Sequence, residues 1–107
     1  MAELRISPEV KKELQQIRGY IAKDLDNPKA AMAIVRKIME QIKKLQDFPN
    51  LGTPLSAHIA FETSYRFLVC GEYLVFYRVE TDGVYVDLVV HGQRDYIRIL
   101  FGAMPFQ

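Results

Sequence analysis

The sequence predicts an α+β domain, in which a helical hairpin packs on one antiparallel sheet. Three observations indicate this class. Apolar residues recur at helical spacing through the first half, β-branched and aromatic residues concentrate after Ser64, and prolines and glycines separate the two regions. The expected order is β-α-α-β-β-β with a short C-terminal helix. With 107 residues the chain has the size of one domain, so we expect a single domain over residues 1–107.

The first half predicts one short strand and two helices. Residues 3–6 alternate polar and apolar side chains, which is typical of a strand. A helix to about Lys23 follows, because Ser7 is a good N-cap and Pro8 suits the first helical position. Asp26-Asn27-Pro28 repeats this signal and opens a second helix, so the two helices should form an antiparallel hairpin. Their apolar stripes consist of Val10, Leu14, Ile17 and Ile21, and of Ala31, Val35, Ile38, Ile42 and Leu45.

The second half predicts a meander of three strands. Residues 48–54 hold two prolines and a glycine and are expected to form a loop. The short connections 71–72 and 80–83 suit hairpin turns between consecutive strands. Asp95 can cap a short last helix that ends at Gly102. The predicted strands cover residues 65–70, 73–79 and 84–90.

Composition excludes several classes of site. Cys70 is the only cysteine, so no intramolecular disulfide can form, and no Cys/His cluster is present that could hold zinc. We therefore expect no metal and no cofactor. No stretch reaches the 18 or so apolar residues of a membrane span, and the N-terminus lacks the apolar core of a signal peptide. A cytoplasmic protein without membrane contact is the expectation.

Charge is distributed unevenly along the chain. The net charge is +1, but residues 1–50 carry ten Lys/Arg against seven Asp/Glu, whereas residues 51–107 carry four against six. Nonspecific nucleic-acid binding depends on clustered basic residues that neutralise phosphates. The sequence therefore predicts a poor generic nucleic-acid binder, whose contacts use a few placed arginines or the basic helices.

Five local strings follow one another in a characteristic order. They are Ile17-Arg18-Gly19-Tyr20, Pro49-Asn50-Leu51-Gly52, Tyr65-Arg66, the strand from Gly71 to Val79 with its Phe-Tyr-Arg-Val end, and Val90 to Asp95 with His-x-x-Arg-Asp. Each string alone is common, but their order and spacing over residues 3–101 resemble the RelE/ParE toxin superfamily, specifically its ParE-like branch.

This resemblance implies a toxin of a bacterial type II toxin–antitoxin module, neutralised by an antitoxin that wraps around it. Some ParE-like members inhibit DNA gyrase, and a gyrase-directed growth inhibitor that acts by binding is our first expectation. The alternative is a RelE-like mRNA interferase, a metal-independent endoribonuclease that cuts mRNA in the ribosome. A third alternative is a degenerate member that keeps antitoxin binding without toxicity. Fold similarity alone does not choose among them.

The ribonuclease alternative requires side chains that act as base, cation and acid. The resemblance implies basic residues on the central strands, an arginine after the last strand and a nearby tyrosine. Leu68 and Leu74 occupy positions where further basic residues are expected, which disfavours cleavage. The candidate catalytic residues, if the protein is a ribonuclease, are Arg66, Arg78, His91, Arg94 and Tyr96.

Each candidate also has a structural interpretation. His91 can act as acid and base near neutrality, or it can hydrogen-bond a neighbouring strand and fix the sheet corner. Arg78 should share a face with Phe76, where it either pairs with an acidic residue of a neighbouring strand or binds phosphate or an acidic antitoxin residue. Arg66 has the same two interpretations. The strand aromatics are mostly expected in the core, whereas Met32 can mark an adaptable contact surface.

Overall fold

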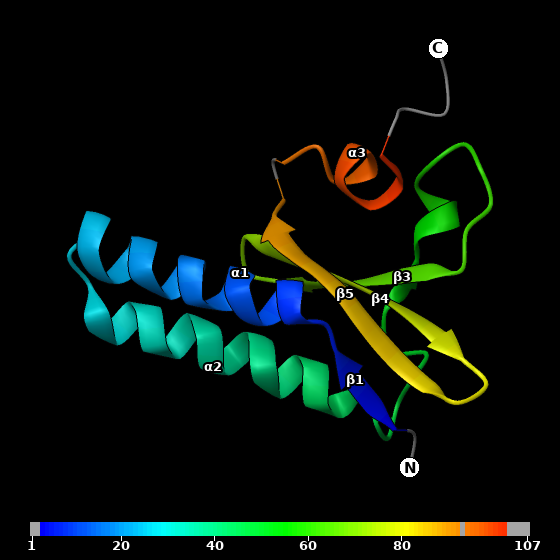
Figure 1. The fold of residues 1–107 in the computed structure, drawn as a ribbon, viewed down its shortest axis with the longest axis horizontal. Coiled ribbons are helices and arrows are strands. Elements are labelled where there is room, and N and C mark those ends of the chain that lie inside the picture. Colours follow the sequence, from blue (N-terminus) through cyan, green and yellow to red (C-terminus); the bar gives the residue numbers. More distant parts are fainter. Residues whose placement is uncertain (1–2, 93, 103–107) are drawn as a thin grey trace.

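The computed structural model describes residues 3–92 and 94–102. Two long helices lie side by side on one face of a sheet, and a short helix lies at its other face (Figure 1). The helices are α1 (Pro8–Gly19), α2 (Pro28–Lys44) and α3 (Tyr96–Phe101). The strands are β1 (Leu4–Ile6), β2 (Thr53–Pro54), β3 (Tyr65–Cys70), β4 (Tyr73–Glu80) and β5 (Gly83–His91). The predicted α+β class and the order of its main elements are confirmed.

The sheet is mixed, which corrects the expectation of a purely antiparallel one. Its strand order is β1-β5-β4-β3-β2, and β1 runs parallel to β5 while the other neighbours are antiparallel. Parallel neighbours need a long crossover, and here the crossover contains the helical hairpin and three strands, β2, β3 and β4. The segment 48–54 is also not wholly a loop, because Thr53 and Pro54 pair with Phe67 and Arg66 as an edge strand.

The helices begin where the sequence predicts. The Ser7 Oγ accepts the Val10 N–H at 3.2 Å, and the Asn27 Oδ1 accepts the Ala30 N–H at 3.1 Å. After α1 the chain continues in a π-helical turn, Tyr20–Asp24, so helical backbone extends just beyond the predicted end. Among the described residues, no helix has the length and apolarity that a membrane crossing requires.

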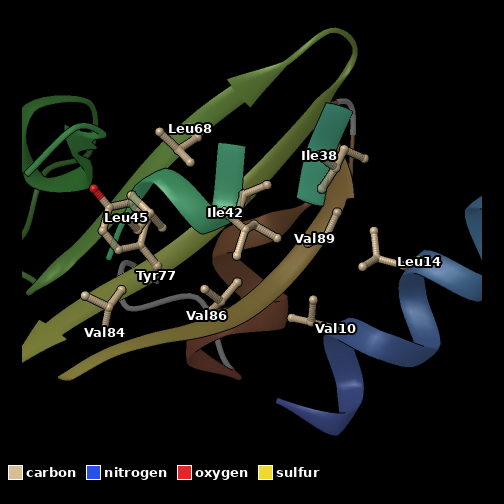
Figure 2. Packing of buried hydrophobic residues seen from close by; sticks show 11 residues of the cluster. Val10, Leu14, Ile38, Ile42, Leu45, Leu68, Tyr77, Val84, Val86 and Val89 are labelled. Atoms are coloured by element: carbon tan, nitrogen blue, oxygen red, sulfur yellow. The ribbon is translucent and has the colours of Figure 1, made fainter. Parts of the chain in front are cut away.

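Buried side chains form two clusters, one on each face of the sheet. The cluster below the helical hairpin includes Val10 and Leu14 of α1 and Ile38 and Ile42 of α2, which pack on valines of β5 (Figure 2). The cluster on the opposite face contains Leu55, Phe76, Leu88 and Val90, against which residues of α3 pack. Both faces of the sheet are therefore covered, one by the helical hairpin and the other in part by α3.

A β-bulge directs side chains of β5 into both clusters. Phe76 pairs with Leu88 but Tyr77 pairs with Val86, so Asp87 is left over between them. As a result Val86 faces the helical hairpin, whereas Leu88 faces α3. The bulge also turns the Asp87 carboxylate toward β4, where it becomes a hydrogen-bond acceptor.

Candidate functional site

A hollow of about 490 Å³ lies where one side of α1, the end of β5 and α3 meet. Its lining mixes ionisable, aromatic and apolar side chains, and two of the five candidate residues are among them. The lining residues are Glu13, Gln16, Ile17, Tyr20, Tyr73, Val89, Val90, His91, Arg94 and Ile99. We treat this hollow as the candidate site.

Glu13 closes one wall of this site by binding the backbone of β5. Its Oε1 accepts the Val89 N–H at 2.9 Å, at a part of β5 that extends beyond β1. Burial raises the pKa of the Glu13 carboxyl, while the Val89 hydrogen bond and the positive charge of Arg94 oppose that rise. The sequence analysis missed Glu13, because a glutamate beside the apolar stripe of a helix gives no signal of its strand partner.

His91 ends β5 at the mouth of the site. It pairs with Tyr73 across the sheet, and its ring meets the Tyr73 ring edge-on with centroids 5.6 Å apart. Its Nε2 lies 3.7 Å from the Glu72 Oε2, close enough for an ion pair when the imidazole is protonated. His91 therefore has the neighbours of a residue that fixes the sheet corner, while 38% of its side chain stays exposed.

Arg94 lies beside His91 because the chain turns directly after β5. The Arg94 N–H donates to the His91 carbonyl at 3.0 Å, which holds the turn that leads into α3. The Arg94 side chain is exposed and lines the same hollow. Gln93, between Gly92 and Arg94 in the predicted His-x-x-Arg-Asp string, lies outside the described residues.

Tyr20 connects the site to a second hollow. This neighbouring space of about 350 Å³ shares Tyr20, Tyr73 and His91 with the first, and it continues toward Leu25 and Ile34 of the helical hairpin. Tyr20 opens the π-helical turn and stays 52% exposed, and Leu25 is 57% exposed. A π-helical turn is a rare backbone feature that often occurs at functional sites. We call the two hollows together the tyrosine groove.

Arg66 lies in a different part of the molecule. Its Nη1 donates to the Gly52 carbonyl at 2.7 Å and to the Asn50 carbonyl at 3.5 Å. Arg66 thus binds the Pro49–Gly52 loop. It points to the hairpin face of the sheet, because it pairs with Tyr77, which belongs to the cluster below the helices.

The Arg78 guanidinium contacts neighbouring side chains on the opposite face of the sheet. Its Nε donates to the Asp87 Oδ2 at 2.8 Å, its Nη1 donates to the Glu80 Oε1 at 3.0 Å, and the guanidinium lies 4.4 Å from the centre of the Tyr85 ring. The Asp87 hydrogen bond is the main reason that the pKa of Arg78 is raised. The Tyr65 hydroxyl also donates to Asp87 at 2.9 Å, and burial followed by this contact raises the pKa of Tyr65 to about 12.

The five candidates therefore do not form one cluster. Arg78 lies five positions along β4 from Tyr73, the partner of His91, which corresponds to about 16 Å of strand. Tyr96 opens α3 and stacks on Phe76, with ring centroids 4.9 Å apart. Only His91 and Arg94 line the same hollow.

Comparison with known proteins agrees with this fold. The family model of the ParE toxin of type II toxin–antitoxin systems, parDE, matches residues 4–96. The chain belongs to this ParE toxin family. A solved chain of the chromosomal ParDE TA system from P. aeruginosa is similar to it, with a TM-score of 0.71 and 22% identity over 85% of this chain and 96% of that chain. No curated protein sequence matches.

Two strings of the ParE resemblance meet at one loop. The Tyr77 hydroxyl of the Phe-Tyr-Arg strand donates to the Pro49 carbonyl at 2.8 Å and accepts the Gly52 N–H at 2.8 Å. Arg66 of the Tyr-Arg string binds the same loop from the side. Two strands, β3 and β4, thus hold the Pro49–Gly52 turn in place, so these residues support the ParE fold at this point.

Proposed function

We propose that this ParE family toxin acts by binding DNA gyrase in the cytoplasm and is held inactive by a cognate antitoxin. The observation that carries a binding mechanism is the separation of the candidate catalytic side chains, of which only His91 and Arg94 share a hollow. Metal-free RNA cleavage needs base, cation and acid within reach of one phosphate. A toxin that acts by surface contact needs no such assembly.

The central strands support the same proposal. Arg66 binds a backbone loop and Arg78 binds two carboxylates, so both guanidinium groups are already held by acceptors of the protein itself. Leu68 packs below the helical hairpin and Leu74 packs against the opposite cluster. The positions at which a RelE-like ribonuclease carries further cations are therefore part of the core.

The tyrosine groove is the surface that we assign to the antitoxin. It combines exposed apolar side chains with ionisable groups around its rim, which suits a helical or extended protein segment better than a small charged ligand. The related P. aeruginosa structure is described as a ParDE toxin–antitoxin system, which supports an antitoxin partner for this chain.

The first test separates gyrase from ribosome as the target. The chain is induced without antitoxin in a bacterial host, and pulse-labelled DNA and protein synthesis are followed in the first minutes. An early stop in DNA synthesis, with loss of supercoiling by purified gyrase in vitro, is the expected result. An early stop in translation with cut mRNA would instead establish the RelE-like activity, and undisturbed growth with soluble protein would indicate a degenerate member.

Single substitutions at the hollow sharpen this test. A ribonuclease should lose its toxicity in His91→Ala or Arg94→Ala while keeping its fold, because acid–base groups contribute about 10²–10⁴-fold each. A binding toxin should keep most of its gyrase inhibition in either variant, because one rim contact contributes little to a large interface. Circular dichroism of each variant controls for folding.

The antitoxin assignment has its own test. Tyr20→Ala removes an exposed ring from the tyrosine groove, and we expect it to weaken capture of the antitoxin encoded beside the toxin gene. Val69→Ala is the matched control, because Val69 is 66% exposed but lies on β3 and does not line the groove. Equal antitoxin affinity for both variants would show that the antitoxin binds elsewhere.

A further inference from the structure

Charge is divided between the two layers of the molecule. The helical hairpin, residues 8–44, contains nine Lys/Arg and five Asp/Glu, a net charge of +4, whereas the remaining residues contain five and eight, a net charge of −3. The hairpin forms a layer on one face of the sheet (Figure 1). A chain that is almost neutral as a whole therefore has a positive helical side and a negative sheet side.

The positive charges of the helical side are not compensated. All nine basic side chains of the hairpin are exposed, and within residues 3–92 and 94–102 none of them forms a salt bridge. Arg5, Arg78 and Arg98 of the other layer each contact a carboxylate. The nine are Lys11, Lys12, Arg18, Lys23, Lys29, Arg36, Lys37, Lys43 and Lys44.

Helix α2 arranges three of these cations in a row. Lys29, Arg36 and Lys43 recur every seven residues, which is close to two helical turns, so they lie on one side about 10 Å apart along the axis. The buried residues of α2 are Ala31, Ile38 and Ile42, on the opposite side of the helix. We call this exposed side of α2 the basic row.

The composition of the basic row favours nucleic acid over protein. Stable protein interfaces need a cluster of apolar or aromatic residues at their centre, and between Lys29 and Lys43 this side of α2 holds, besides its cations, Ala33, Glu40 and a single large apolar side chain, Met32. Protein–DNA interfaces are more polar and much more positive. A row of unpaired cations matches a phosphate backbone, whose charges follow one another at short intervals along the duplex.

We propose that the basic row binds the phosphate backbone of double-stranded DNA without sequence preference. The choice of DNA rests on the proposed function, because gyrase presents a DNA duplex to any protein bound beside it. The negative sheet layer is repelled by the same phosphates, so the molecule approaches DNA with its helices first. With few phosphate contacts the Kd should lie near the weak end of the nonspecific range, about 10⁻⁴ M at physiological salt.

The test measures DNA binding with gyrase absent. Anisotropy of a labelled mixed-sequence duplex is followed as the full-length chain is added, at salt concentrations from about 50 to 200 mM. The variant Arg36→Ala/Lys43→Ala removes two charges from the basic row, and alanine preserves helix propensity. The control Arg5→Ala/Arg98→Ala removes two charges from the sheet layer, so both variants have the same net charge. Lys29→Ala/Lys43→Ala replaces the first variant if circular dichroism shows a loss of helix.

Each lost phosphate contact should lower the slope of log K against log salt by about 0.9. We therefore expect the basic-row variant to lower the slope by about two, and the control to leave it within half a unit of the wild-type value. Equal slopes for the two variants would overturn the proposal, as would tighter binding to an RNA duplex or no DNA binding at the lowest salt. Because no gyrase is present, these outcomes do not depend on the gyrase inhibition test.

Discussion

The hydroxyl of Tyr77 accepts the N–H of Gly52 at 2.8 Å, and this contact joins the middle of the sheet to the loop that follows α2. The same hydroxyl donates to the Pro49 carbonyl at 2.8 Å. Both Tyr77 and Gly52 are buried, so water cannot replace either partner. The buried Tyr77 hydroxyl therefore holds this loop in place from within the core.

Tyr77→Phe removes the hydrogen bonds to this loop without leaving a cavity in the core. The ring still fills its place, but the buried Gly52 N–H loses its acceptor, which costs about 1–3 kcal/mol of stability. Urea denaturation of wild type and variant measures the difference. Tyr85→Phe is the control, because its hydroxyl donates to the exposed Asp82, and its midpoint should stay near that of wild type. A Tyr77→Phe midpoint equal to that of the control would contradict this role.

Gly52→Ala tests the same loop from its other partner. An added Cβ would lie 2.7 Å from the Phe67 carbonyl oxygen and 2.7 Å from the Tyr77 ring, so backbone or ring must shift. Overpacking of this kind costs about 1–3 kcal/mol. Gly19→Ala is the matched control, because its Cβ would meet nothing within 4 Å and its backbone is helical. There alanine should raise stability by about 0.5–1 kcal/mol, and thermal denaturation compares the two.

The helices were predictable because their signals are local. Ser7 and Asn27 cap the helices they precede, and the apolar spacing that follows fixes which face is buried. The partner of β1 was not predictable in this way. Whether a three-residue strand joins β5 in parallel depends on contacts about 80 residues apart, which leave no periodic trace in the sequence.

The bulge in β5 shows a further limit of periodicity. In a regular strand Val84, Val86, Leu88 and Val90 would all lie on one face, because alternate side chains point the same way. In the structure Val84 and Val86 face the hairpin, whereas Leu88 and Val90 face α3, because Asp87 adds one residue to the strand. The candidate site could not be predicted from periodicity either. Its hydrogen bond between Glu13 and Val89 joins two residues that are far apart in the sequence.

The Arg78–Asp87 contact should contribute measurably to stability. The two side chains are 33% and 23% exposed, and a bulge fixes the carboxylate toward its partner. A double-mutant cycle with Arg78→Ala and Asp87→Ala should give a coupling energy of about 1 kcal/mol, measured by urea denaturation. The Arg98–Asp95 pair is the control, because its side chains are 67% and 55% exposed and such pairs couple by at most about 0.5 kcal/mol. Equal coupling in both cycles would show that the Arg78–Asp87 contact is no stronger than an exposed ion pair.

Glu13 should make stability depend on pH, and the sign follows from its raised pKa. Burial favours the protonated carboxyl in the folded chain, so the folded protein binds this proton more tightly than the unfolded one. Stability is then highest below the ordinary value of 4.5 and falls as pH rises through the raised pKa. Above the raised pKa of Glu13 the folded protein carries the cost of an ionised, partly buried carboxylate.

Glu13→Gln removes this cost and keeps the hydrogen bond, because the amide oxygen can still accept the Val89 N–H. We expect the variant to have a higher Tm than wild type at pH 7, and the difference to shrink with falling pH and disappear below pH 4.5. Glu62→Gln controls for the loss of one negative charge, since Glu62 is exposed. A Glu13→Gln variant less stable than wild type at pH 7 would show that the charge itself is needed, through its attraction to Arg94 across the hollow.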